Sequence, residues 1–366
     1  MLRRVAWENF DYWLLGLVAT AVIFGIAMIR SAIAGNAELA EAPGRQLIFA
    51  ALGFVLMLGL AAMDYHHWRP LSKYLYVGTV LTLIALKLVG TALFGSARWF
   101  AVGPIKIQPS EFAKIVLILV QADFLSRYRE RLHELRWVLL SAALTGGLVI
   151  WVLLQPDLST SITLVVIWLA MLWAAGLRGK HILLFIGLGI VASVAGFPFL
   201  ADYQKARILT FFFPDETARH GAIYNVLQAL ISIGSGGWFG HGYGQGPQVQ
   251  YRFLKVRHTD FIFAVIAHEL GFVGAMLTIV LLSTIIWRCL RIARRAYDTF
   301  GALIATGVAA MLGFHMTVNI AMNLNLIPVT GLPLPFITYG GSSLVSTLIA
   351  IGLVESVALY RRPLEP

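Results

Sequence analysis

The sequence predicts an all-α polytopic membrane protein, because of its composition, its long apolar runs and the placement of its cations. Of 366 residues, 59% are hydrophobic and only 13% are charged, whereas a typical soluble domain is about 25% charged. The mean hydropathy is +0.79. This balance excludes a disordered chain, a coiled coil and an ordinary cytosolic enzyme. The single cysteine, Cys289, excludes an internal disulfide framework and any CxxC metal site.

Ten apolar runs are long enough, near the 20 or so residues that a bilayer requires, to be membrane spans. They cover residues 12–33, 45–63, 71–90, 110–126, 137–155, 158–176, 182–200, 260–287, 300–322 and 338–360. The first run is too long for a cleavable signal peptide and lacks a small-residue cleavage site, so it is predicted as the first span. The chain is expected to form one integral membrane domain over residues 1–366.

The cations indicate which way the spans run. The chain has 28 Lys and Arg against 18 Asp and Glu, a net charge of +10. An even number of spans places both termini on one side, and if that side is the cytoplasm the inside segments hold sixteen of the 28 cations. The opposite loop, 35–44, has Glu38 and Glu41 and no cation. The positive-inside rule therefore predicts that both termini are cytoplasmic.

Two segments on the predicted outside break this rule. One is 91–109, with Arg98 and Lys106, and the other is the long loop of about 60 residues, 201–259, between the seventh and eighth spans, with Lys205 and Arg207 among its cations. The long loop is either simply solvated or an outward site for an anion. The second interpretation is favoured, because its cations alternate with glycines and aromatic residues and not with acids.

Glu111 and Lys114 form an ionisable pair at the start of the fourth span. In the run Pro109-Ser110-Glu111, Ser110 can cap a helix and Glu111 favours its positive end. Lys114 lies three residues after Glu111 and shares its helix face. A pair of this kind is costly in a membrane unless it faces a polar cavity. A purely structural ion pair is the alternative, and cavity lining is the favoured prediction.

Two aspartates stand at predicted helix starts. Asp157, in the turn between the fifth and sixth spans, is either a turn or cap residue or a functional one. Asp260 stands where the long loop enters the eighth span, where capping is again the simpler explanation. Thr259 is an equally good cap, however, and cations flank the position, so a functional Asp260 is favoured. The spacing of His258, His268 and Glu269 is not HExxH, which argues against a catalytic zinc.

Two further segments are rich in glycine or proline. The run 228–246 has enough glycine for backbone N–H groups to approach a ligand closely, or simply to be flexible, and it contains no nucleotide-binding motif. Three prolines in eight residues, Pro328, Pro333 and Pro335, prevent a regular helix. Irregular backbone at membrane depth needs protein or a wet cavity beside it. This proline segment is therefore predicted to form one wall of an outward cavity.

Taken together, these motifs closely resemble the SEDS family (shape, elongation, division and sporulation) along nearly the whole chain. The blocks that carry the resemblance are Ala97–Phe100 (ARWF), Gln108–Lys114 (QPSEFAK), Gln155–Leu158 (QPDL), Ile233–Gly237 (IGSGG), His258–Phe263 (HTDFIF) and Gly331–Ser343 (GLPLPFITYGGSS). The short N-terminus, the second block and Pro-Val-Thr-Gly at 328–331 favour the rod-shape branch over the division branch.

The resemblance implies a peptidoglycan glycosyltransferase of the bacterial plasma membrane that polymerises lipid II on the extracytoplasmic side during elongation. It implies that Asp260 is the general base. It also implies substrate-binding roles for a set of polar residues: Arg98, Glu111, Lys114, Asp157, Lys205, Arg207 and Gln228. The implied partners are a lipid-linked glycan strand and a class B penicillin-binding protein. No cofactor is implied with certainty, and a divalent cation such as Mg²⁺ stays open.

Three other functions stay open at this stage. A lipid II flippase needs a site that both leaflets can reach, whereas Asp260 and the cation-rich loops all lie on the predicted outside. A secondary transporter should show an internal repeat with paired broken helices, which this sequence lacks. A non-catalytic scaffold that activates a partner synthase would not need the Asp260 side chain.

Overall fold

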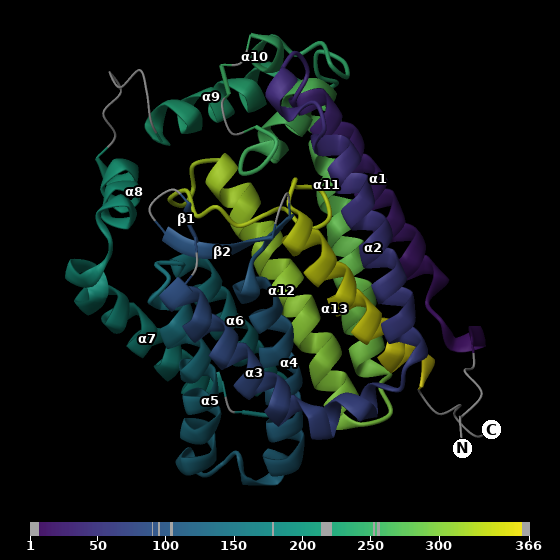
Figure 1. The fold of residues 1–366 in the computed structure, drawn as a ribbon, viewed down its shortest axis with the longest axis vertical. Coiled ribbons are helices and arrows are strands. Elements are labelled where there is room, and N and C mark those ends of the chain that lie inside the picture. The colour runs from purple at the N-terminus through teal and green to yellow at the C-terminus, as the bar shows by residue number, and fades with distance from the viewer. Residues whose placement is uncertain are drawn as a thin grey trace.

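The computed structural model describes residues 7–89, 91–93, 96–102, 105–177, 179–213, 222–251, 253–254 and 257–360. Within these ranges the chain is mostly helical (Figure 1). The α-helices are α1 (Tyr12–Ala32), α2 (Ala42–Ala62), α3 (Trp68–Val89), α4 (Pro109–Tyr128), α5 (Leu135–Leu153), α6 (Leu158–Ala174), α7 (Gly179–Gly196), α8 (Asp202–Phe212), α9 (Ala222–Ser235), α10 (Pro247–Gln250), α11 (Ile262–Arg294), α12 (Thr299–Asn323) and α13 (Gly341–Leu359). Single turns of 3₁₀-helix cover Trp7–Asn9, Ala37–Leu39, Tyr65–His67, Arg129–Arg131 and Phe197–Phe199.

Each of the ten predicted runs is a helix, and most of their ends agree within about three residues, the usual uncertainty of helix ends. In the described ranges, seven helices are long and apolar enough to cross a membrane, namely α1, α2, α3, α5, α11, α12 and α13. The other three predicted spans are less clear-cut. α4 carries several charges, α6 has 17 residues, and the apolar part of α7 is short.

A small antiparallel sheet makes the prediction of an all-α chain wrong at one place. β1 (Thr91–Leu93), β2 (Ser96–Val102) and β3 (Ile105–Ile107) pair in that order between α3 and α4. The sequence predicts 91–109 only as an outside segment, because strands of three to seven residues carry too little periodic pattern to be recognised. The strands lie across one end of the helices (Figure 1).

The long segment 201–259 is also more ordered than a loop. It contains α8, α9 and α10, which lie at or beside the end of the bundle opposite the start of α1 and the end of α13 (Figure 1). The proline segment between α12 and α13 is irregular, as its prolines predict.

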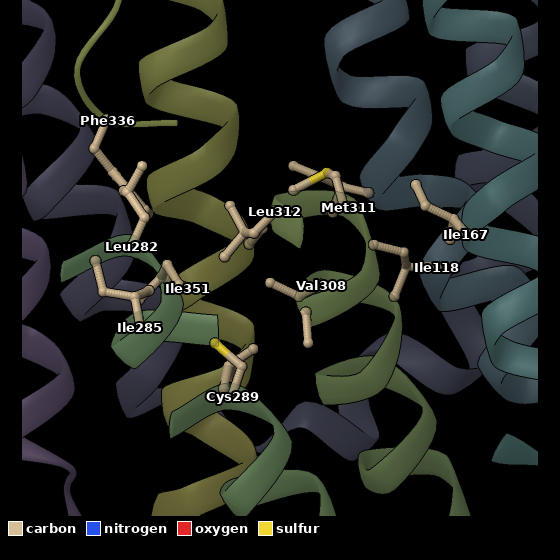
Figure 2. Close-up of a cluster of buried hydrophobic side chains, with 14 of the residues drawn as sticks. Ile118, Ile167, Leu282, Ile285, Cys289, Val308, Met311, Leu312, Phe336 and Ile351 are labelled. Atoms are coloured by element: carbon tan, nitrogen blue, oxygen red, sulfur yellow. The ribbon is translucent and has the colours of Figure 1, made fainter. Parts of the chain in front are cut away.

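Helix α12 forms the centre of the bundle and contacts α4, α6, α11 and α13. Figure 2 shows Val308, Met311 and Leu312 of α12 between Ile118 and Ile167 on one side and side chains of α11 and α13 on the other. Where helices meet most closely the residues are small. A Cβ on Gly352 of α13 would lie 2.6 Å from the Met57 carbonyl oxygen of α2. Such close packing, more than hydrophobic exclusion, stabilises helix pairs in lipid.

Candidate active site

Asp260 lies two residues before α11, on the turn that leads into it, and its side chain is half-buried. The N-terminus of helix α11 is capped by a side chain of another helix. The capping position is Phe261, which has no side-chain oxygen, and the Ala264 N–H donates instead to Asn323 Oδ1 of α12 at 3.1 Å. The capping explanation for Asp260 and Thr259 is therefore wrong, and the Asp260 carboxyl is not used to start the helix.

The backbone of Asp260 is held by α12. Its carbonyl accepts hydrogen bonds from Asn323 Nδ2 at 3.0 Å and Asn319 Nδ2 at 3.4 Å. Its carboxyl faces the proline segment, because a Cβ on Gly331 would lie 4.0 Å from Asp260 Oδ2. Gly331 has a φ of +78°, a conformation that glycine adopts without steric cost.

Burial raises the pKa of Asp260, and the positive charge of Arg207 opposes part of this rise. A carboxylate that is desolvated in this way binds a proton more tightly than an exposed one. The position therefore has the property expected of a general base, in which the proton affinity must suit a weakly acidic hydroxyl.

Arg207 links α8 to the proline segment. Its Nη1 donates to the carbonyl oxygens of Val329 and Thr330, both at 3.4 Å. A cavity of about 220 Å³ opens beside this contact, and its polar lining includes Asp157, Ser159, Gln204 and Arg207. The proline segment contributes Pro328, Val329 and Thr330 to the same lining, as predicted for a cavity wall.

Asp157 serves as the cap of α6, one of the two roles left open for it. It accepts from the Thr160 N–H at 3.2 Å and the Thr160 hydroxyl at 2.9 Å. Gln108 Nε2 donates a third hydrogen bond to the Asp157 carboxyl, at 3.2 Å. Two more hydrogen bonds join the segments that line the cavity. Ser159 Oγ donates to the Thr330 carbonyl at 2.6 Å, and Gln204 Nε2 donates to the Pro156 carbonyl at 3.1 Å. Asp157 is thus a structural cap that also lines the cavity.

Glu111 and Lys114 form the predicted ion pair, with Lys114 Nζ 2.9 Å from Glu111 Oε1. Both side chains are buried, and they also contact Ser346 and His315. Ser110 is not the cap that the sequence suggested, since Pro109 already occupies the first helical turn and Gln108 precedes it. The enclosed geometry fits the structural ion pair, and contact of either residue with a substrate stays a prediction.

The remaining predicted residues are less closely tied to the cavity. Arg98 belongs to β2, but its side chain lies outside the described part of the structure. Lys205 is on α8, two residues before Arg207. Gln228 is on α9, where its carbonyl accepts from the Ser232 hydroxyl at 2.7 Å. Their roles in binding stay predictions.

The glycine run packs on protein and does not form an open anion cradle. The Phe272 and Val273 N–H groups donate to the Gly237 and Trp238 carbonyls at 2.8 and 3.1 Å. A Cβ on Gly240 would overlap the Glu269 carbonyl of α11. The glycines therefore allow the run to dock on α11, and the backbone groups that pair with α11 do not form the predicted ligand cradle. Flexibility of the run stays a prediction.

A further cation of the long segment 201–259 has a structural role. Arg257 is buried and donates to the Ala32 and Leu254 carbonyls, so it ties the segment to α1. Within the described ranges, no three His, Cys, Asp or Glu side chains are grouped as metal ligands.

Sequence reasoning missed Asn319 and Asn323, although two amides in an apolar helix are themselves a signal of polar function.

Residues 11–363 match the model of the cell cycle protein family named for FtsW, RodA and SpoVE. The chain belongs to this family. The family resemblance predicted from the motifs is therefore confirmed over nearly the whole sequence.

Relatives of known name come from several branches of the family. Stage V sporulation protein E of Bacillus subtilis is 37% identical over 321 residues, 87% of this chain and 87% of that protein. Peptidoglycan glycosyltransferase MrdB of Escherichia coli K12 is 35% identical over 372 residues, 99% of this chain and 97% of that protein. A probable peptidoglycan glycosyltransferase FtsW of Geobacter sp. M18 is 33% identical over 371 residues, 99% of each chain. The rod-shape branch stays a prediction.

Two solved structures share the fold. A chain of a peptidoglycan synthase complex, studied for the coordination of polymerization and crosslinking, aligns with a TM-score of 0.82 and 31% identity, over 96% of this chain and 99% of that one. The rod shape determining protein RodA of Thermus thermophilus aligns with a TM-score of 0.72 and 30% identity, over 97% and 99%.

Proposed function

We propose that the chain, a peptidoglycan glycosyltransferase, polymerises lipid II with Asp260 as its general base. The observation that carries this proposal is a half-buried carboxyl that does not cap its helix and faces the proline segment, whose residues 328–330 line the Arg207 cavity. Membership of the family, in which several relatives carry the name peptidoglycan glycosyltransferase, supports the reaction class.

In the proposed reaction the C4 hydroxyl of one lipid-linked unit attacks C1 of the muramyl sugar at the reducing end of another. A new C–O bond forms, the bond from C1 to the pyrophosphate oxygen breaks, and undecaprenyl pyrophosphate leaves with the electron pair. The hydroxyl proton passes to the Asp260 carboxylate. The leaving group is already good, so it needs charge neutralisation more than protonation. Arg207 and Lys205 on α8 are suited to that role.

A divalent cation has a limited place in this scheme. The described side chains offer no group of three ligands that could hold a metal, so the proposed step involves no protein-bound metal. Mg²⁺ commonly binds through substrate phosphates with few protein ligands. The proposal is that any Mg²⁺ accompanies the pyrophosphate of lipid II.

All ten predicted spans are proposed to cross the membrane, with both termini in the cytoplasm of a bacterial cell. Helix α6 is only 17 residues long, roughly 26 Å, which a locally thinned bilayer can accommodate. The site then faces the extracytoplasmic side, because α8 and α9 lie away from the start of α1 and the end of α13 (Figure 1). The polyprenyl tail can stay in lipid while its head group reaches the cavity.

The proposed partner is a class B penicillin-binding protein, and the proposed setting is cell elongation. A structurally similar chain belongs to a peptidoglycan synthase complex, which supports the existence of such a partner. A flippase or a non-catalytic scaffold would carry out its role without a base at position 260. A polymerisation assay of a variant without the Asp260 carboxylate therefore separates these alternatives from the enzyme.

The test is polymerisation of lipid II by purified full-length protein, with glycan products resolved on a gel. Asp260→Asn should lower the rate by about 10²–10⁴-fold, the usual contribution of a general base, without loss of monodispersity or thermal stability. Asp202→Asn, an exposed residue on α8, is the matched control and should retain activity. Wild-type rates in well-folded Asp260→Asn protein would refute the assignment.

A further inference from the structure

Two asparagines lie one helical turn apart at the end of α12. Asn319 and Asn323 are fully buried, with no exposed surface. A buried amide in an apolar environment is costly unless its donors and acceptor are paired. Both amides are paired, and the partners include the segment that carries Asp260.

Asn323 starts the neighbouring helix. Its Oδ1 accepts from the Ala264 N–H at 3.1 Å, a role that the capping residue of α11 itself usually fills. Its Nδ2 donates to the Asp260 carbonyl at 3.0 Å and to the Asn319 carbonyl at 2.8 Å. One side chain of α12 therefore fixes both the first turn of α11 and the residue just before it.

Asn319 joins the same residue to the cavity wall. Its Nδ2 donates to the Leu332 carbonyl at 2.8 Å and approaches the Asp260 carbonyl at 3.4 Å. Leu332 follows Gly331, the residue that the Asp260 carboxyl faces. The two asparagines thus connect an irregular wall and an irregular turn to the rigid central helix.

We propose that Asn319 and Asn323 are positioning residues that fix the Asp260 carboxyl relative to the proline segment. The inference rests on the proposed function of Asp260. It adds that the precision of the site comes from α12, since neither the turn at 257–260 nor the segment at 324–340 is regular structure. A catalytic group needs such support, because a displacement of about 1 Å can cost about 10²-fold in rate.

The proposal predicts a loss of turnover without a loss of binding. Asn323→Leu and Asn319→Leu keep the approximate side-chain volume and remove the amide. Each should lower kcat for lipid II polymerisation by about 10- to 100-fold, with KM little changed because the cavity cations remain in place. Hydrogen exchange at residues 262–264 should also become faster in the Asn323→Leu protein.

Asn36→Leu is the matched control. Asn36 lies in the turn after α1, where its side chain accepts a local N–H, that of Glu38. If the leucine variants are not monodisperse, Asn319→Ser and Asn323→Ser, which keep a small polar group, replace them. An unchanged kcat in the variants at both positions would overturn the proposal. A fall in kcat in the Asn323 variant with unchanged hydrogen exchange at 262–264 would overturn it as well.

The exchange experiment is repeated in Asp260→Asn protein, which needs no activity. Faster exchange there on addition of Asn323→Leu would show that the amide holds the segment, even if Asp260 were not the base. A fully active Asp260→Asn protein would refute the proposed function, while unchanged exchange would refute the positioning role. The two failures are therefore distinguishable.

Discussion

At the scale of single residues, the role of Asp260 depends on which side chain caps α11. The sequence places Asp260 and Thr259 at the helix start, and either residue could have been the cap. The cap is Asn323, which lies 59 positions after Ala264, the residue whose N–H it accepts. No local pattern can reveal a partner at that separation. The sequence could therefore predict Asp260 as a functional residue, but not that its carboxyl is free of the capping role.

The pH dependence of turnover follows from the surroundings of Asp260. A base must be ionised, and because burial raises the pKa of this carboxyl, it becomes protonated at a higher pH than an exposed aspartate. The acid limb of the kcat/KM profile should therefore lie above the usual carboxyl range. Arg207→Gln removes a charge that lowers the pKa of Asp260, so it should move this limb to higher pH.

The measurement is a pH–rate profile of lipid II polymerisation with wild-type and variant protein. Arg291→Gln, at the far end of α11, is the matched control and should leave the limb in place. An Arg207→Gln limb at the wild-type position would contradict either the base or the proximity of the two charges.

The buried Glu111–Lys114 pair gives a second prediction at this scale. Lys114→Met should lower the free energy of unfolding by about 3–5 kcal/mol, because it leaves the Glu111 charge buried and uncompensated. The double variant with Glu111→Gln should recover most of that stability. Thermal unfolding in one detergent measures both effects.

The same variants test substrate binding. A double variant that is stable but needs more lipid II would support the predicted contact with the substrate. Wild-type lipid II dependence in the stable double variant would leave the pair a structural one only.

At the scale of elements, long apolar runs were sufficient to predict the ten long helices, because each run approaches the length that a bilayer requires. The shorter elements were not predictable. Helix α9 has 14 residues and the three strands have three to seven. Their positions depend on contacts with distant segments, as does the docking of the glycine run on α11.

Gly271 is the position where that docking can be tested. It interrupts α11 with a φ of 68°, and a Cβ there would overlap the Gly240 nitrogen. Gly271→Ala should therefore cost about 1–3 kcal/mol in unfolding free energy and expose the 236–246 amides to exchange. Gly59→Ala on α2, where a Cβ meets nothing within 4 Å, is the control and should be neutral.

At the scale of the whole molecule, the candidate site joins the centre of the bundle to its edge. Asp260 is fixed to α12, which lies in the middle, whereas Arg207 comes from α8 at the periphery (Figure 1). Sequence order gives no indication of this arrangement, because Arg207 belongs to the segment 201–259, predicted as a single loop, and Asp260 to the start of the predicted span that follows it. What the motifs could predict was the residues themselves.

This arrangement gives a reason for activation by a partner. Helix α8 carries strongly exposed apolar side chains, with Phe212 at 66%, so part of its surface is free to be covered. A class B penicillin-binding protein that rests on α8 and α9 would hold Arg207 beside Asp260 and reduce the entropy lost on binding lipid II. The chain alone should polymerise slowly, and the partner should raise the rate by about tenfold or more, about 1.4 kcal/mol in activation free energy.

Rates with and without the partner in one detergent test this prediction, together with hydrogen exchange across 202–212. Exchange in α8 should slow when the complex forms, and the gain in rate should shrink in Arg207→Gln protein, because the residue being positioned is then absent. Equal rates with complex formation confirmed would refute the ordering of α8 as the means of activation. They would leave the role of Asp260 intact, since its support from α12 does not involve α8.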